Sequence, residues 1–260
     1  MDAFSLYRRY VAISIRAQLA YPATFLMKTF GHLLVTGIEF FGIWALFSRF
    51  GTLGGWQLHE VGLIYGLVDV GFALADSVSR GFTKLGTLLK KGEFDRMLLR
   101  PRSPVLQLLA YEVQLMRLGR FLQGLAVLVW ASTYIAWSPE TVVLVVASIA
   151  STACLFLGLA VLQGTSAFWT IENLEVWNAF TYGGNYAAEY PMSIYRRWFR
   201  GFFTVIIPLA LTSYYPTLAV LGRAPLDALH WLAPCAGFAF LALMLQVFRL
   251  GIRHHTSTGS

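Results

Sequence analysis

The chain has 260 residues, of which 57% are apolar and 13% are charged, and the apolar residues fall in long runs. This composition excludes an ordinary soluble domain, which carries about 25% charged residues. The net charge of +7 does not indicate nucleic-acid binding, because basic residues in a membrane chain are first explained by the side of the membrane on which they lie.

The first predicted element is an interfacial helix at residues 1–19, where apolar side chains are mixed with Arg8, Arg9 and Arg16. Six spanning helices follow, because a bilayer core about 30 Å thick needs about 20 mostly apolar residues per helix. We predict five of them at residues 23–47, 61–78, 118–137, 142–169 and 229–248, and another, the fifth in chain order, that starts near residue 201 and includes Pro208. A cytosolic loop at 79–104, a second cytosolic segment at 171–200 and a flexible tail at 254–260 complete one transmembrane domain, 1–260.

Basic residues predict the orientation, because Lys and Arg near the ends of spans stay in the cytosol. With the N-terminus inside, the cytosolic segments hold fifteen of these residues and the external turns hold two, Arg49 and Arg223. The fold class predicted is therefore an all-α polytopic membrane protein with six transmembrane helices and both termini in the cytosol.

The sequence predicts no catalytic residues. It lacks a Gly-x-x-x-x-Gly-Lys-Ser/Thr phosphate loop, a His-Glu-x-x-His zinc pair and a Gly-x-Ser-x-Gly nucleophile motif. Cys154 and Cys235 lie in apolar runs and lack metal-ligand spacing. We expect neither an enzyme nor a metal site, and no cofactor bound by this chain.

The most informative segment is the basic loop between the second and third spans. Leu85, Leu88 and Leu89 precede it at helical spacing, and Pro101 and Pro104 end it. One interpretation is a loop that binds anionic headgroups, which explains the basic residues but not the acids among apolar side chains. The other is a short docking helix, with apolar side chains for a partner's groove and charges that fix its register.

This loop resembles that of the ABC-2 type transporter permeases. Residues 91–101 run basic, Gly, Glu, apolar, Asp, Arg, then apolar residues ending in Arg-Pro, and Phe94 and Met97 stand where leucine is commoner in that family. Weaker support comes from Phe168-Trp169, Ile206-Ile207-Pro208 and Tyr214-Tyr215-Pro216. The resemblance covers most of the chain in the order of its spans.

The resemblance implies a six-helix permease in a bacterial cytoplasmic membrane. It would pair with a second like permease, as a homodimer or heterodimer, and bind two separate ATP-binding cassette subunits that carry ATP and Mg. The coupling residues implied are Lys84, Leu88, Lys91, Gly92, Glu93, Phe94, Asp95 and Arg96, with Tyr195 and Arg196 in a segment, 189–200, that packs nearby. An aromatic and basic interfacial anchor is the alternative for Tyr195 and Arg196.

Five ionisable residues lie inside the first two spans, where a charge costs about 2.5–3.5 kcal/mol. They are Lys28, His32 and Glu39 on one helix face, and Asp69 and Asp76 on another. Because the two spans run in opposite directions, we expect Lys28 to lie near Asp76 and His32 near Asp69.

These charges have two interpretations. They form a buried ion-pair network that holds two helices together, which close packing through Gly62 and Gly66 supports, or they line a substrate or proton path. Glu39 is the best candidate for a path, because no basic partner is evident for it. Arg117 and Arg120 are expected to extend to cytosolic phosphates.

The function predicted is the permease of an ATP-driven exporter with a hydrophobic, amphipathic or glycan-type cargo. The alternative is a membrane enzyme or scaffold that uses the intramembrane polar cluster, although the cluster has no nucleophile beside a base.

Overall fold

Helices form most of the chain in a computed structural model that describes residues 3–170 and 176–254. Over this part of the chain the only extended pairing is a bridge between Leu53 and Trp56 within a turn. Of the predicted tail, His254 ends a helix, and residues 255–260 lie outside the described residues. The prediction of an all-helical membrane protein is confirmed.

Four helical segments are long and apolar enough to cross a bilayer. They are α2 (Pro22–Phe50), α3 (Leu58–Val78), α9 (Pro139–Thr170), and α13 (Ala228–Leu232) taken together with α14 (Cys235–His254). At 1.5 Å per residue, the 21 residues of α3 are about 32 Å long, close to the thickness of the bilayer core. Two shorter helices, α8 (Leu118–Ser132) and α10 (Val176–Ala188), lie beside α3.

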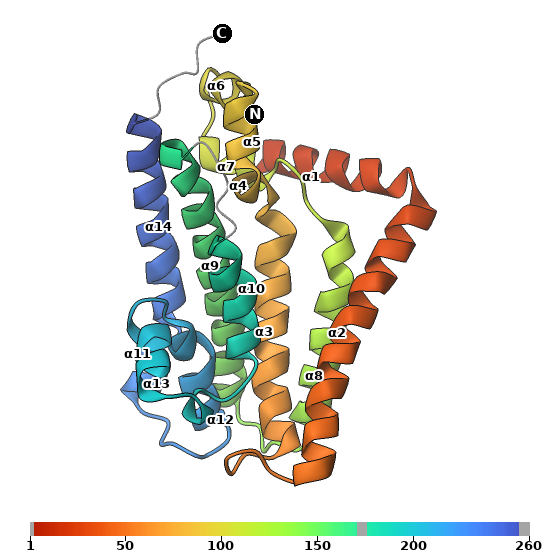
Figure 1. Ribbon diagram of the computed structural model, residues 1–260, viewed down its shortest axis with the longest axis vertical. Helices are drawn as coiled ribbons and strands as arrows, with labels where there is room; N and C mark the ends of the chain where they lie inside the picture. The colour runs from red at the N-terminus through yellow and green to blue at the C-terminus, as the bar shows by residue number, and fades with distance from the viewer. Residues whose placement is uncertain (1–2, 171–175, 255–260) are drawn as a thin grey trace.

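The bundle has two ends, which we name after the segments that lie there (Figure 1). The loop end carries the short helices α4 (Arg80–Thr83), α5 (Leu85–Lys90), α6 (Glu93–Leu98) and α7 (Pro104–Leu109). The turn end carries the 51–57 turn between α2 and α3. Gly51, Gly54 and Gly55 all have positive φ there, a backbone conformation that favours glycine.

The N-terminal helix α1 (Ala3–Leu19) lies across the loop end (Figure 1). Ser14 Oγ accepts a hydrogen bond from Val113 N at 3.1 Å, and Gln18 Oε1 accepts one from Leu115 N at 3.0 Å. These bonds attach α1 to the segment that leads into α8. A helix is present where the sequence predicts one, and its position in the headgroup layer stays a prediction.

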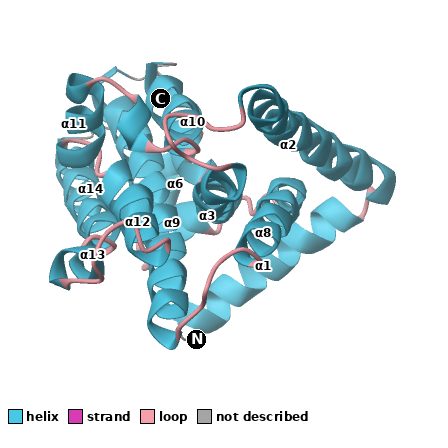
Figure 2. Cartoon of the chain, turned by 90° about the horizontal axis from the view of Figure 1, so that it is seen from below, coloured by secondary structure: helices cyan, strands magenta, loops and turns pink. Residues whose placement is uncertain are grey.

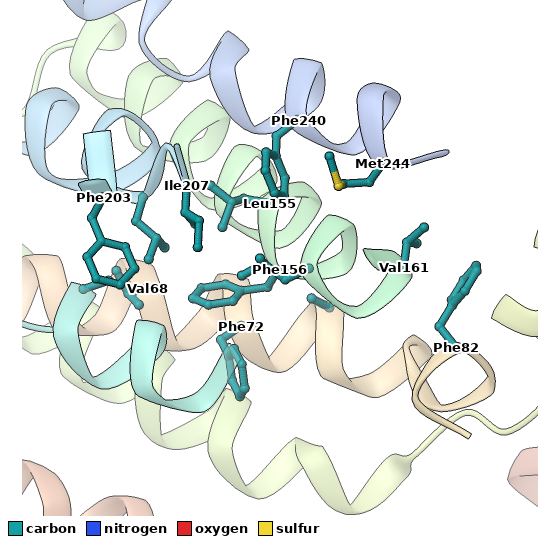
Figure 3. Close-up of a cluster of buried hydrophobic side chains, with 14 of the residues drawn as sticks. Val68, Phe72, Phe82, Leu155, Phe156, Val161, Phe203, Ile207, Phe240 and Met244 are labelled. Atoms are coloured by element: carbon teal, nitrogen blue, oxygen red, sulfur yellow. The ribbon is translucent and has the colours of Figure 1, made fainter. Parts of the chain in front are cut away.

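The core lies between α3, α9 and α14, and Figure 3 shows part of it. The rings of Phe72 and Phe156 meet edge to face with centroids 4.8 Å apart, a favourable aromatic geometry. On the other side of α3, a Cβ at Gly66 would lie 2.8 Å from the backbone of Leu128 in α8, and one at Gly62 would lie 2.9 Å from Trp130. The close packing predicted for these two glycines is confirmed.

The third predicted span is shorter than expected, because α8 ends at Ser132 rather than at residue 137. Trp137 Nε1 turns back and donates a hydrogen bond to Ser132 O at 2.8 Å. This bond satisfies one of the carbonyl groups that a helix end leaves without a partner.

The fifth predicted span, starting near residue 201, is not confirmed as one straight helix. Its residues form α11 (Arg197–Val205), the π-helix η3 (Ala210–Tyr214) and α12 (Tyr215–Val220), and the two arms bend by 83°. Pro208 lies in the break, where it cannot donate a helical backbone hydrogen bond.

Both ends of this bent pair contact the 51–57 turn. Before the pair, Ser193 Oγ accepts a hydrogen bond from Trp56 Nε1 at 3.0 Å. After it, Arg223 Nη2 donates to Gly55 O at 2.8 Å. The chain therefore enters and leaves the bent pair at the turn end, so we name residues 197–220 the re-entrant pair.

Between α9 and the re-entrant pair lies the helix α10, in the region that the sequence placed in the cytosolic segment 171–200. Near its start, Trp177 Nε1 donates to Ser166 Oγ in the last two turns of α9. Its 13 residues include Asn178, Thr181 and Asn185, and their polarity hid the helix from a hydropathy analysis. Residues 171–175 of that predicted segment lie outside the described part of the chain.

Candidate functional site

Arg120, in α8, is the centre of a buried polar cluster. Its side chain is only 7% exposed, and its Nε lies 2.8 Å from Asp69 Oδ1. Its Nη2 lies 3.5 Å from Glu189 Oε1 and 3.5 Å from Glu39 Oε2. One guanidinium therefore faces three carboxylates contributed by α2, α3 and the residue after α10.

Neutral side chains complete this Arg120 cluster. Asn185 Nδ2 donates to Glu189 Oε1 at 2.6 Å, and the Tyr186 hydroxyl donates to Glu39 Oε1 at 3.0 Å. The Arg120 guanidinium carbon lies 4.7 Å from the centroid of the Phe72 ring, a favourable cation–π distance. Buried charges persist when they are paired and hydrogen-bonded in this way.

Two expectations about these charges are wrong. Arg120 does not extend to cytosolic phosphates, because its guanidinium is buried against carboxylates. Glu39 does have a basic neighbour, and it is Arg120. Glu189 was not predicted to join these charges, because the sequence places it in a cytosolic segment, whereas it is buried directly after α10.

The pairing expected between the first two spans is also wrong, because both aspartates of α3 face α8. Asp76 Oδ2 lies 2.9 Å from Arg117 Nε, which donates to Gln114 Oε1 at 3.0 Å. Lys28 is exposed and lies beside a small cavity that Glu112 also lines. His32 is half-buried, and its Cβ lies beside Gly119 of α8.

A cavity of about 260 Å³ lies on the loop-end side of the Arg120 cluster, between α3, α9 and α10. Phe72 and Phe156 form its apolar wall, and Asp76, Arg80 and Arg117 supply its charges. Most of the remaining lining residues carry amide or hydroxyl groups, among them Gln163 of α9 and Asn178 and Thr181 of α10. The cavity therefore offers more basic than acidic groups, together with neutral hydrogen-bonding groups.

At the loop end, the structure buries two of the predicted coupling residues. Leu88 and Phe94 are 1% and 0% exposed, and the Phe94 ring lies 5.5 Å from the Phe168 ring of α9. Their expected role as outward apolar contacts is wrong, because they fill the core beneath the loop. The apolar side chain that does project is Leu99, which is 85% exposed.

The polar residues predicted to couple to an ATPase lie on the outside of the same short helices. Lys91 and Arg96 are exposed, and Glu93 and Asp95 are half-buried. Lys84 Nζ lies 3.2 Å from Glu112 Oε2. Gly92, with φ of 64°, allows α5 to turn directly into α6, so these side chains form a compact charged surface.

Tyr195 and Arg196 lie at the turn end, the opposite end from the coupling loop. Ser193 is bonded to Trp56 and Ile194 lies beside Gly54, so the chain here packs on the 51–57 turn. The expectation that segment 189–200 packs near the coupling helix is wrong. Burial, with Tyr190 and Glu189 nearby, raises the pKa of Tyr195 to about 12, and its phenol stays neutral at physiological pH.

Comparison with known proteins supports the resemblance seen in the sequence. A family model described as ABC-2 family transporter protein matches residues 33–259. No curated protein and no solved structure matches the chain. Among the residues that the structure describes, no group of three or more His, Cys, Asp and Glu side chains is placed to hold a metal ion.

Proposed function

Since the chain belongs to the ABC-2 transporter family, we propose that it is the membrane-spanning subunit of an ATP-driven exporter. Family membership identifies it as a multi-pass membrane permease of an ABC system. The observation that supports coupling to ATP is the charged, exposed surface of α5 and α6, which project at the loop end of the bundle (Figure 1).

The proposed topology has six crossings, made by α2, α3, α8, α9, α10 and α14. An even number leaves the N-terminal helix and the end of α14 on one side, and both lie at the loop end (Figure 1). With Arg196, Arg197 and Arg200 moved to the turn end, twelve basic residues lie at the loop end and five at the turn end. This excess supports a cytosolic loop end.

ATP hydrolysis takes place on partner subunits in this proposal. The sequence contains no phosphate loop, so two ATP-binding cassette subunits would carry ATP and Mg, and this chain would bind neither. Lys91, Arg96 and Leu99 are exposed and would contact the ATPase. A basic and apolar surface of this kind suits an acidic groove with an apolar floor.

A second like permease would complete the transport path, in a homodimer or heterodimer in the bacterial cytoplasmic membrane. The helix α2 stands apart from the rest of the bundle (Figure 2). Few of its apolar side chains are covered within one chain: Met27, Ile38 and Phe50 are 70%, 68% and 66% exposed. Lipid and a second permease are both suited to cover them. The cargo is proposed to be a hydrophobic, amphipathic or glycan-type molecule.

The coupling surface is tested by one pair of matched substitutions. Arg96→Glu and Arg196→Glu each reverse an exposed arginine, the first at the loop end and the second at the turn end. Co-purification from native membranes, followed by mass spectrometry, should recover about tenfold less phosphate-loop ATPase with Arg96→Glu. Recovery with Arg196→Glu should equal that of the wild type. Equal recovery with both variants, or no ATPase with the wild type, would contradict the proposal.

The topology is tested by labelling single cysteines with an impermeant thiol reagent in intact cells, after Cys154 and Cys235 are replaced by serine. Arg197→Cys should be labelled from outside, and Lys91→Cys only after the membrane is opened. Labelling of Arg197→Cys only from inside would restore the topology that hydropathy predicts and remove the crossing assigned to α10.

A further inference from the structure

We infer that the cavity between α3, α9 and α10 is a binding site for a phosphate group carried by an amphiphile or by a soluble phosphate ester. As a step in export this inference rests on the proposed function. Binding itself needs no ATPase and is measured on the chain alone.

The charges of the cavity favour an anion. Two arginines, Arg80 and Arg117, and one carboxylate, Asp76, line the cavity, and Asp76 is paired with Arg117. The lining therefore keeps an excess positive charge. Arginine suits phosphate, because its planar guanidinium donates several hydrogen bonds in a fixed geometry.

Arg80 is poorly neutralised by the protein. Its Nε is buried and has no hydrogen-bond partner among the described residues. The nearest carboxylate oxygen, Glu112 Oε2, lies 3.9 Å away and is held more closely by Lys84, at 3.2 Å. The Arg80 side chain as a whole is 38% exposed, so its terminal nitrogens are within reach of a ligand. A buried N–H donor without a partner is costly, and a phosphate oxygen in the cavity would satisfy the Nε.

The remaining walls fit the atoms that adjoin a phosphate. Gln163 and Asn178 present amides and Thr181 a hydroxyl, which can bond the hydroxyl groups of a glycerol or sugar unit. Phe72 and Phe156 present apolar surface beside them. A volume of about 260 Å³ is below the range of about 300–1,000 Å³ for drug-sized ligands, so the cavity holds a headgroup and not a whole lipid.

The test uses the purified full-length chain in detergent and titrates dioctanoyl phosphatidylglycerol, with uncharged dioctanoylglycerol as the comparison lipid. Saturable binding of the phospholipid alone is expected. Arg80→Gln should weaken it about tenfold. Arg100→Gln removes an exposed arginine that does not line the cavity and is expected to leave affinity unchanged.

A second variant keeps every charge. Asn178→Trp fills the cavity from α10 and should also weaken binding about tenfold. This variant tests the site independently if Arg80→Gln fails to fold. Competition by glycerol 1-phosphate would identify a free phosphate ester as the ligand source, and its failure to compete would identify a lipid.

The inference is overturned if the phospholipid and dioctanoylglycerol bind equally, if neither phosphate compound binds, or if Arg80→Gln and Arg100→Gln reduce affinity equally. The last result would mean general attraction to basic residues. Failure to find a partner ATPase would contradict the proposed function and leave this binding measurement unaffected.

Discussion

Two helices of equal mean hydropathy, α2 and α3, have different surroundings. In the most apolar part of α3, 78% of the residues are buried within the chain, against 17% in α2. In Figure 2, α3 lies among its neighbours and α2 stands to one side. Apolar content therefore identifies a membrane helix without indicating whether protein or lipid surrounds it.

The space around the glycines also distinguishes the buried helix α3 from the exposed helix α2. In α3, a Cβ at Gly66 or Gly71 would lie 2.8 Å from a neighbouring helix. In α2, a Cβ at Gly31, Gly37 or Gly42 would meet nothing within 4 Å. Small residues permit close helix packing in membranes, but only a neighbouring helix makes them necessary.

The largest predicted effect concerns the buried charges that α3 faces. Arg120→Met leaves Asp69 and Glu189 buried without their cation, which should cost about 3–5 kcal/mol. We expect the apparent melting temperature, measured by size-exclusion chromatography of heated detergent extracts, to fall by roughly 10 °C. Lys28→Met removes an exposed cation of α2 and should change stability by less than about 0.5 kcal/mol. Equal losses would remove the distinction between the helices.

A smaller effect is expected from the glycines. Gly66→Ala places a methyl group against the Leu128 backbone and should destabilise by about 1–3 kcal/mol. Gly37→Ala meets open space and should be neutral, or stabilising by up to about 1 kcal/mol through helix propensity. The same melting measurement checks both, and a stable Gly66→Ala would show that α8 can move away from α3 at little cost.

The smallest effect on stability is expected at Glu39, which links α2 to the cluster. Glu39→Gln keeps an acceptor for Tyr186 but loses the attraction to Arg120, so the melting temperature should change by about 2 °C or less. In Glu39→Gln, α2 loses part of its attachment to the cluster. Spin labels on the exposed positions Val35 of α2 and Val146 of α9 should therefore give a wider distance distribution in this variant than in the wild type. The control is Glu140→Gln, at an exposed acid near the turn end. An unchanged distribution would mean that lipid or packing alone holds α2.

The structure explains which features could be predicted from the sequence. Gly62 and Gly66 are a local pattern within one helix, so their packing could be predicted. The Arg120 cluster joins residues 51 and 69 positions apart, and no local pattern specifies that contact. In α10, Thr181 and Asn185 are buried against protein, and their polarity led hydropathy to predict a loop there. The more apolar residues of the re-entrant pair were predicted as a span instead.

The attachment of the re-entrant pair has a mechanical consequence for α3. Arg223 donates two hydrogen bonds to Glu60, at 2.7 and 2.6 Å, and stacks 4.2 Å from the Trp56 ring. Glu60 lies in the first turn of α3, and the short helices of the loop end follow its last turn. A single helix about 32 Å long therefore joins the loop end to the re-entrant pair. If the loop binds an ATPase as proposed, a shift of α3 along its axis would displace the re-entrant pair on the far side of the bundle.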